Sequence, residues 1–151
     1  MMLLDSEFEE FRALPIILQH PMLVAELDTI AGVIDSWTGG GAEGDPTAAR
    51  LLLLVGHFTQ ALPTHFATEE KSTAALLRDG ADPEFRRRLL ALDSEHPQLL
   101  ACFQAAVQQL SDFCAAGNTQ PKALQPAITD LKLAIAEFRR HEAAEDQLFV
   151  E

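Results

Sequence analysis

HFATE at His65–Glu69 and HEAAE at His141–Glu145 share the pattern His-x-x-x-Glu. On an α-helix this spacing places the histidine and the glutamate on one face, one turn apart. A His-Pro step comes 45 residues before each of these histidines, at His20-Pro21 and at His96-Pro97. A shift of 76 residues therefore carries four residues of the first half onto four of the second half. The chain contains an internal repeat of two units, whose matching residues are mostly metal-ligand types.

Start and stop signals divide the chain into helices around these motifs. Asp45-Pro46 and Asp82-Pro83 each combine an N-cap aspartate with a proline at the first helical position. Glycine-containing breaks follow at 39–44, 79–81 and 117–118. No alternating strand pattern appears. We expect a short amphipathic lead-in at 7–14 and then four long helices, over about 15–37, 46–78, 83–116 and 121–151.

Four long helices joined by short loops predict an all-α fold, an up-down-up-down four-helix bundle. We expect one domain over residues 1–151, with its core at about 15–151. Hydrophobic residues make up 48% of the 151 residues, which excludes a disordered chain. The first helix has apolar residues at helical spacing that should face the core: Leu23, Leu27, Ile30 and Ile34.

Three of the prolines inside the expected helices lie within two residues of a histidine: Pro21, Pro63 and Pro97. A proline inside a helix removes one hydrogen bond and kinks the helix. Two interpretations stay open. The kinks are either tolerated or they shape the bundle around a site.

The charge of the chain excludes several partners. Its net charge is −12, which would repel phosphate backbones, so we expect no nucleic-acid partner. The basic cluster Arg86–Arg88 is interpreted as a solvated helix face. The longest apolar run, Leu51–Val55, is too short to span a bilayer, so we expect no membrane partner.

Compartment and reactivity are constrained by three further features of the sequence. The N-terminus has no basic n-region and turns acidic at Asp5, directly after four apolar residues, so it does not predict a signal peptide. Cys102 and Cys114 are too far apart on one helix to form a disulfide, and two unpaired thiols favour the reducing cytoplasm. The chain has no tyrosine, which excludes a tyrosyl radical or a phenolate ligand.

The repeat predicts a metal site in the middle of the bundle. Its side chains divide into two equivalent sets of two histidines and one glutamate, and the glutamates are the natural bridges between two metals. Such a set suits Fe(II), Mn(II) or Zn(II) and leaves positions open for an exogenous ligand. The predicted ligands are His20, His65, Glu69, His96, His141 and Glu145. We predict no catalytic side chain.

Some residues near the motifs stay uncertain. His57 also lies on the second helix, but the repeat places Leu133 opposite it, so we interpret it as a non-ligand. Glu70 and Asp146 each follow a predicted ligand and could compete for the metal, although they lie about 100° further round the helix. A single His-x-x-x-Glu on a helix is usually a surface pair, and a purely structural bundle would require the repeat to be coincidence.

Together these residues, on four helices in this order, resemble the hemerythrin-like (HHE cation-binding) domains. The resemblance covers about Pro15 to Glu151. It implies a non-haem diiron centre with two iron ions, often oxo- or hydroxo-bridged, that binds O₂ or reacts with it. Members of the family act in O₂ transport or storage, in O₂, redox or iron sensing, and in defence against nitrosative or oxidative stress. One branch is linked to the repair of iron–sulfur clusters.

The sequence departs from the O₂ carriers of this family in two places. Their third helix has two histidines four residues apart, whereas His96 has Leu92 and Leu100 at these positions. Their last motif has a carboxylate five residues after the histidine, which here is Asp146, while the repeat favours Glu145. One metal should therefore keep an open position, which favours a sensing or redox role over reversible O₂ carriage.

The leading hypothesis is a diiron protein that binds O₂ or a related small ligand (NO, peroxide, a small anion) in oxygen or redox sensing or in stress response. One alternative is an enzyme: a diiron oxidase, a peroxidase, or a protein that handles nitric oxide or repairs iron–sulfur clusters. Another is an iron-sensing or storage module that reports to a protein partner. The cluster-repair branch often has an N-terminal cysteine-containing domain, which this sequence does not show.

Overall fold

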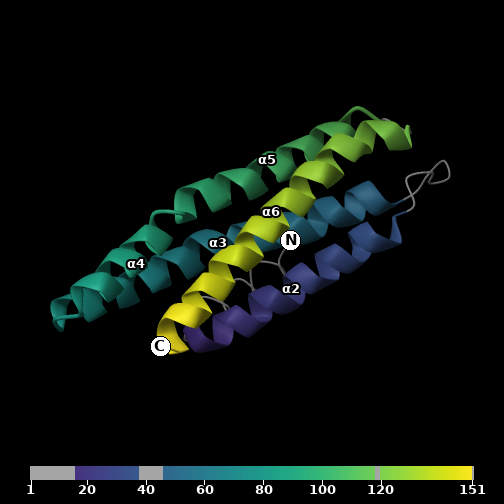
Figure 1. Ribbon diagram of the computed structural model, residues 1–151. Coiled ribbons are helices and arrows are strands. Elements are labelled where there is room, and N and C mark those ends of the chain that lie inside the picture. The colour runs from purple at the N-terminus through teal and green to yellow at the C-terminus, as the bar shows by residue number, and fades with distance from the viewer. Residues whose placement is uncertain (1–15, 38–45, 118–119, 151) are drawn as a thin grey trace.

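The computed structural model describes residues 16–37, 46–117 and 120–150, and all regular structure within these ranges is α-helical (Figure 1). The helices are α2 (Ile16–Ser36), α3 (Thr47–Arg78), α4 (Pro83–Asp93), α5 (His96–Ala115) and α6 (Pro121–Val150). The all-α prediction is confirmed, and three of the four expected helices end within one residue of their expected bounds. The expected lead-in at 7–14, the glycine-rich loop at 39–44 and the expected cap Asp45 lie outside the described residues.

The expected signals act as predicted at the start of α4 and at the ends of α3 and α5, whereas Pro46 precedes α3 as its cap residue rather than as its first helical residue. The carboxylate of Asp82 accepts hydrogen bonds from the backbone N–H groups of Glu84 and Phe85, at 3.1 and 3.3 Å. Gly80 follows α3 with φ of 85°, and Gly117 follows α5 with φ of 61°. This left-handed conformation closes a helix C-terminus and suits glycine, which has no Cβ to clash.

The third expected helix is wrong in one respect: it is two helices, α4 and α5, separated by a turn at Ser94–Glu95. The cause is Pro97, which has no N–H to donate to the carbonyl of Asp93 and whose ring would clash with that carbonyl in a continuous helix. Pro97 therefore lies at the start of α5 rather than inside a helix. The other two prolines, Pro21 in α2 and Pro63 in α3, are inside helices as expected.

The helices form a bundle of four members, with α4 and α5 together as the third (Figure 1). Along the chain, α3 packs against α2, α4 and α5, and α6 packs against α2, α4 and α5. None of the helices in the described part of the chain is long and apolar enough to cross a membrane.

A cluster of phenylalanines closes one side of the bundle interior. Phe58 of α3, Phe103 of α5 and Phe138 of α6 are all buried, with ring centroids 4.9 to 6.1 Å apart. Burying each side chain is worth about 1.5–3 kcal/mol. Each of them lies three or seven residues from a motif histidine, which is one or two helical turns. The aromatic cluster therefore forms a buried apolar layer one to two helical turns from the histidines.

Candidate metal centre

All six predicted ligands meet in the interior of the bundle. They come from α2 (His20), α3 (His65 and Glu69), α5 (His96) and α6 (His141 and Glu145). Five of the six side chains are buried, and His20 is half-buried. Burying so many ionisable groups is costly unless they are paired or bind a cation.

The donor atoms of these residues fall into two groups, and within each group they lie within 4.8 Å of one another. The first group is His20, His65, Glu69 and Glu142, and the second is Glu69, His96, His141 and Glu145. Each group thus contains the two histidines and the glutamate of one half of the sequence repeat. That these residues bind metal stays a prediction; their convergence is a feature of the fold.

Glu69 is common to both groups, as its contacts explain. Its Oε1 lies 2.9 Å from Nε2 of His20 and 2.6 Å from Nε2 of His65. Its Oε2 lies 3.0 Å from Nε2 of His96. One oxygen therefore faces the first group and the other faces the second, which is the arrangement a bridging carboxylate requires.

Glu142 is the member that the sequence did not predict. It is buried, and its Oε2 lies 3.2 Å from Nδ1 of His20. The internal repeat does not indicate this residue, because the shift of 76 residues pairs Glu142 with Phe66, which is not a metal-ligand type. A usable signal was present in its spacing: Glu142 precedes Glu145 by three residues, so these two side chains are neighbours on the helix surface, about one turn apart.

Phe66 has a different use in the site. Its ring stacks on that of His96, with centroids 4.0 Å apart and planes 7° apart. The two halves of the repeat therefore differ at this position, since one supplies a carboxylate and the other an aromatic ring that orients a histidine.

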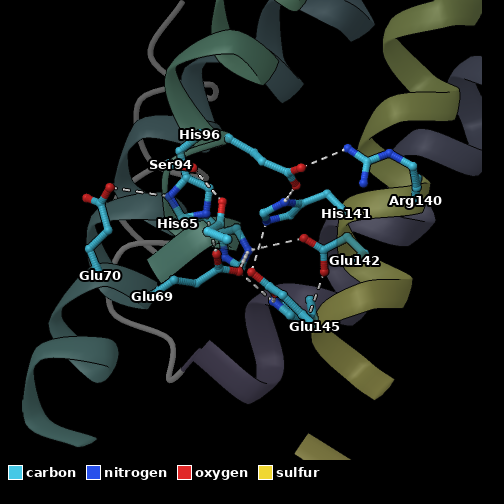
Figure 2. Close-up of polar contacts among 12 residues, drawn as sticks. His65, Glu69, Glu70, Ser94, His96, Arg140, His141, Glu142 and Glu145 are labelled. Atoms are coloured by element: carbon cyan, nitrogen blue, oxygen red, sulfur yellow. Dashed lines mark hydrogen bonds and ion pairs between the residues drawn. The ribbon is translucent and has the colours of Figure 1, made fainter. Parts of the chain in front are cut away.

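Two carboxylates outside the groups orient the histidines of the second group (Figure 2). Nδ1 of His96 lies 3.3 Å from Glu70, and Nδ1 of His141 lies 2.8 Å from Glu95. Arg140 holds Glu95 in place with a contact of 3.0 Å. A carboxylate on the outer nitrogen leaves Nε2 of each ring facing inward and raises its basicity, a common arrangement for metal-binding histidines.

The three uncertain residues of the sequence lie outside both groups, among the residues that the structure describes. Glu70 is exposed and contacts only the outer nitrogen of His96. Asp146 is exposed. His57 is half-buried, with Nδ1 3.0 Å from Glu26. Glu70 therefore orients the ring of His96 from outside the two groups.

The electrostatics of the site shift the pKa values of its histidines upward. Burial by itself lowers the pKa of His65, but hydrogen bonds with Glu142 and Glu69 outweigh it and raise this pKa to about 9. For His141, burial again lowers the pKa, and the hydrogen bond with Glu145 contributes most to raising it to about 9. Without metal, both rings are protonated at neutral pH.

The two glutamates of the motifs shift in opposite directions. Burial raises the pKa of Glu69, but hydrogen bonds from His20, His65 and His96 outweigh it, and its pKa is well below the usual range. The pKa of Glu145 is raised to about 7, because it is buried and lies beside the charge of Glu69. The site without metal therefore holds protons that a cation would displace.

Several buried atoms of the site approach another site residue within 4 Å, but they have no hydrogen bond of good geometry among the described residues: Oε2 of Glu69, Nε2 of His96 and Oε1 of Glu142. Buried polar atoms are rarely left this way unless something else binds them. All three belong to the two groups. The two groups together contain four histidines and three glutamates. Such a mixture of nitrogen and carboxylate donors suits Fe, Mn or Zn better than Mg or Ca, which prefer oxygen alone. The residues thus fit a pair of transition-metal cations.

Comparison with known proteins agrees with this geometry. The family model of the hemerythrin HHE cation binding domain matches residues 16–151. Searches of curated proteins and of solved structures gave no match. The matched range contains every residue of both groups. The chain therefore belongs to the hemerythrin HHE cation-binding domain family.

Proposed function

We propose that this protein holds two iron ions in the two groups and binds O₂ or a related small ligand (NO, peroxide, a small anion) in oxygen or redox sensing or in stress response. The observation that carries the proposal is the pair of adjacent groups that share Glu69. One group alone would suggest a single structural cation. Two groups joined through the two oxygens of one carboxylate favour a dinuclear centre.

In the proposed centre each group supplies four protein donors. Iron often takes more than four ligands, so donor sets of this size leave positions for an exogenous molecule. Iron held here would supply electrons to O₂, or bind NO or peroxide, at those positions. The protein's own residues position the donors: Glu70 and Glu95 fix the rings of His96 and His141, and Phe66 stacks on one of them.

The position of the missing histidine supports a redox or sensing role. Leu92 lies on α4, beyond the turn that precedes His96, so it is not on the same helix as that ligand. Leu100 lies on α5, one turn after His96, and is therefore the one of these two positions that shares a helix with His96. Leucine cannot bind metal, so the second group has one donor fewer than it would in a carrier.

Reaction with O₂ tests the proposal directly. We expect the iron-containing protein, reduced anaerobically and then added to buffer of known O₂ content, to take up one O₂ for every two irons, measured with an oxygen electrode. Nitric oxide should compete with this uptake. The proposal is wrong if the reduced, iron-containing protein takes up no O₂ and if its absorption spectrum does not change on addition of O₂, NO, peroxide or azide.

A further inference from the structure

A cavity of about 470 Å³ opens beside the candidate metal centre, and residues of α2, α3, α4 and α6 line it. Its inner end is formed by His20, Glu69 and Glu145, which are members of the two groups. Cavities of about 300–1,000 Å³ typically hold organic molecules of drug-like size. A diatomic ligand needs far less space, so the small ligands proposed above do not account for this cavity.

Most of the outer wall of the cavity is apolar, although Ser72, Thr73, Asp93 and Asp146 also line it. Leu89 of α4 is buried there, while Leu76 of α3 and Phe149 of α6 are 37% and 58% exposed. Phe149 is held by an edge-on contact with Phe85 of α4, with ring centroids 5.9 Å apart. Large apolar side chains that face a cavity favour an apolar occupant, because covering them removes their surface from water. The wall therefore favours an apolar occupant.

The charges around the cavity disfavour an ion as the occupant. Asp93 and Asp146 line it, and the whole chain carries a net charge of −12, so an anion would be repelled. A cation is disfavoured for a different reason. The apolar side chains of the wall cannot replace the hydration shell of a charged molecule.

We propose that this cavity binds an uncharged, largely apolar organic molecule whose inner end lies against His20, Glu69 and Glu145. Such a molecule would be held where the metal centre can act on it. Any reaction of the bound molecule at the metal centre rests on the proposed function. Binding in the cavity does not, because the apolar side chains of α3, α4 and α6 that form its outer wall are present with or without metal.

Three probes of one shape and different charge test the proposal: 1-naphthylmethanol, 1-naphthoate and 1-naphthylmethylammonium. Calorimetric titration of the purified, metal-containing protein should give saturable binding of one 1-naphthylmethanol per chain. The two charged probes should bind at least about tenfold more weakly. Absence of saturable binding, or tighter binding of either charged probe, would overturn the proposal.

Matched variants locate the site. Leu76→Trp should fill the cavity, and Phe149→Asp should place a charge on its wall, so each should weaken 1-naphthylmethanol binding at least about tenfold. The controls are Leu90→Trp on α4 and Leu133→Asp on α6, at residues that are 44% and 62% exposed and do not line the cavity. Equal binding by the wall variants and their controls would overturn the assignment. The two wall variants change different helices, so either one suffices if the other does not fold.

Metal content, measured in the same samples, separates the two proposals. Fewer than two irons together with the expected pattern of probe binding would refute the diiron centre and leave the cavity standing. Two irons without saturable 1-naphthylmethanol binding would support the diiron centre and refute the cavity proposal. Equal melting temperatures and metal contents across the variants would show that lost binding is local to the cavity.

Discussion

Removing the metal should make the stability of the protein fall as the pH rises from about 6.5 to about 9. His65 and His141 have pKa values of about 9 in the folded, metal-free protein, against 6.5 for an ordinary histidine. Between these values the folded protein holds protons that the unfolded chain has lost, so raising the pH favours unfolding. The stabilisation is complete below pH 6.5 and is lost as the pH passes 9.

The size of this loss follows from the same values. One pKa unit corresponds to about 1.4 kcal/mol, so the rise from 6.5 to about 9 corresponds to about 3 kcal/mol for one histidine. The two histidines share neighbouring carboxylates and should not add fully. We therefore expect a loss on the order of 3 kcal/mol, a large part of the 5–15 kcal/mol of a typical domain.

Urea unfolding of the chelator-treated protein at pH 6 and pH 9.5, followed by circular dichroism, measures this change. His65→Gln should remove a large part of it, while His57→Gln, at a histidine outside both groups, should retain it. Metal should reverse the trend, because it displaces the protons and binds more tightly as the pH rises. A metal-free protein whose unfolding free energy stays constant or increases over this range would refute the reasoning.

Other predictions concern single side chains. His65→Ala should lose metal, because it removes a buried donor, whereas His57→Ala should keep the full metal content by elemental analysis. Glu95→Gln should weaken metal affinity about 10–100-fold by losing the charge behind His141, and Glu137→Gln, which contacts the same arginine but no histidine, should not. Leu100→His should add a donor to the second group, so O₂ taken up by the reduced protein should be recoverable under vacuum for longer than in the wild type; equal recovery would contradict this.

Much of the fold could be predicted from local sequence signals. The N-cap Asp82 and the glycines at 80 and 117 act within a few residues of themselves, so their positions in the chain define the helix ends. The break before His96 could not be predicted from the start and stop signals alone. It depends on whether a proline bends a helix or ends it, and Pro21 and Pro97 have opposite outcomes after the same His-Pro step.

The site was predictable to the extent that the repeat encodes it. The six repeated ligand positions converge because equal spacing on similar helices gives similar placement. Glu142 breaks the repeat, and Glu95 acts from a turn that the sequence did not predict. The cavity beside Glu69 was also beyond reach, since its wall joins Leu76, Leu89 and Phe149 from three helices whose packing the sequence pattern does not specify.

Counting the metals tests the central claim most directly. Protein purified without added metal, analysed for iron, manganese and zinc, should contain two irons per chain. Glu69→Gln should lower the content of both sites together, because this carboxylate belongs to both groups. Glu70→Gln is the control at the adjacent, exposed glutamate and should keep most of the iron. One zinc per chain, or no metal at all, would contradict the diiron centre.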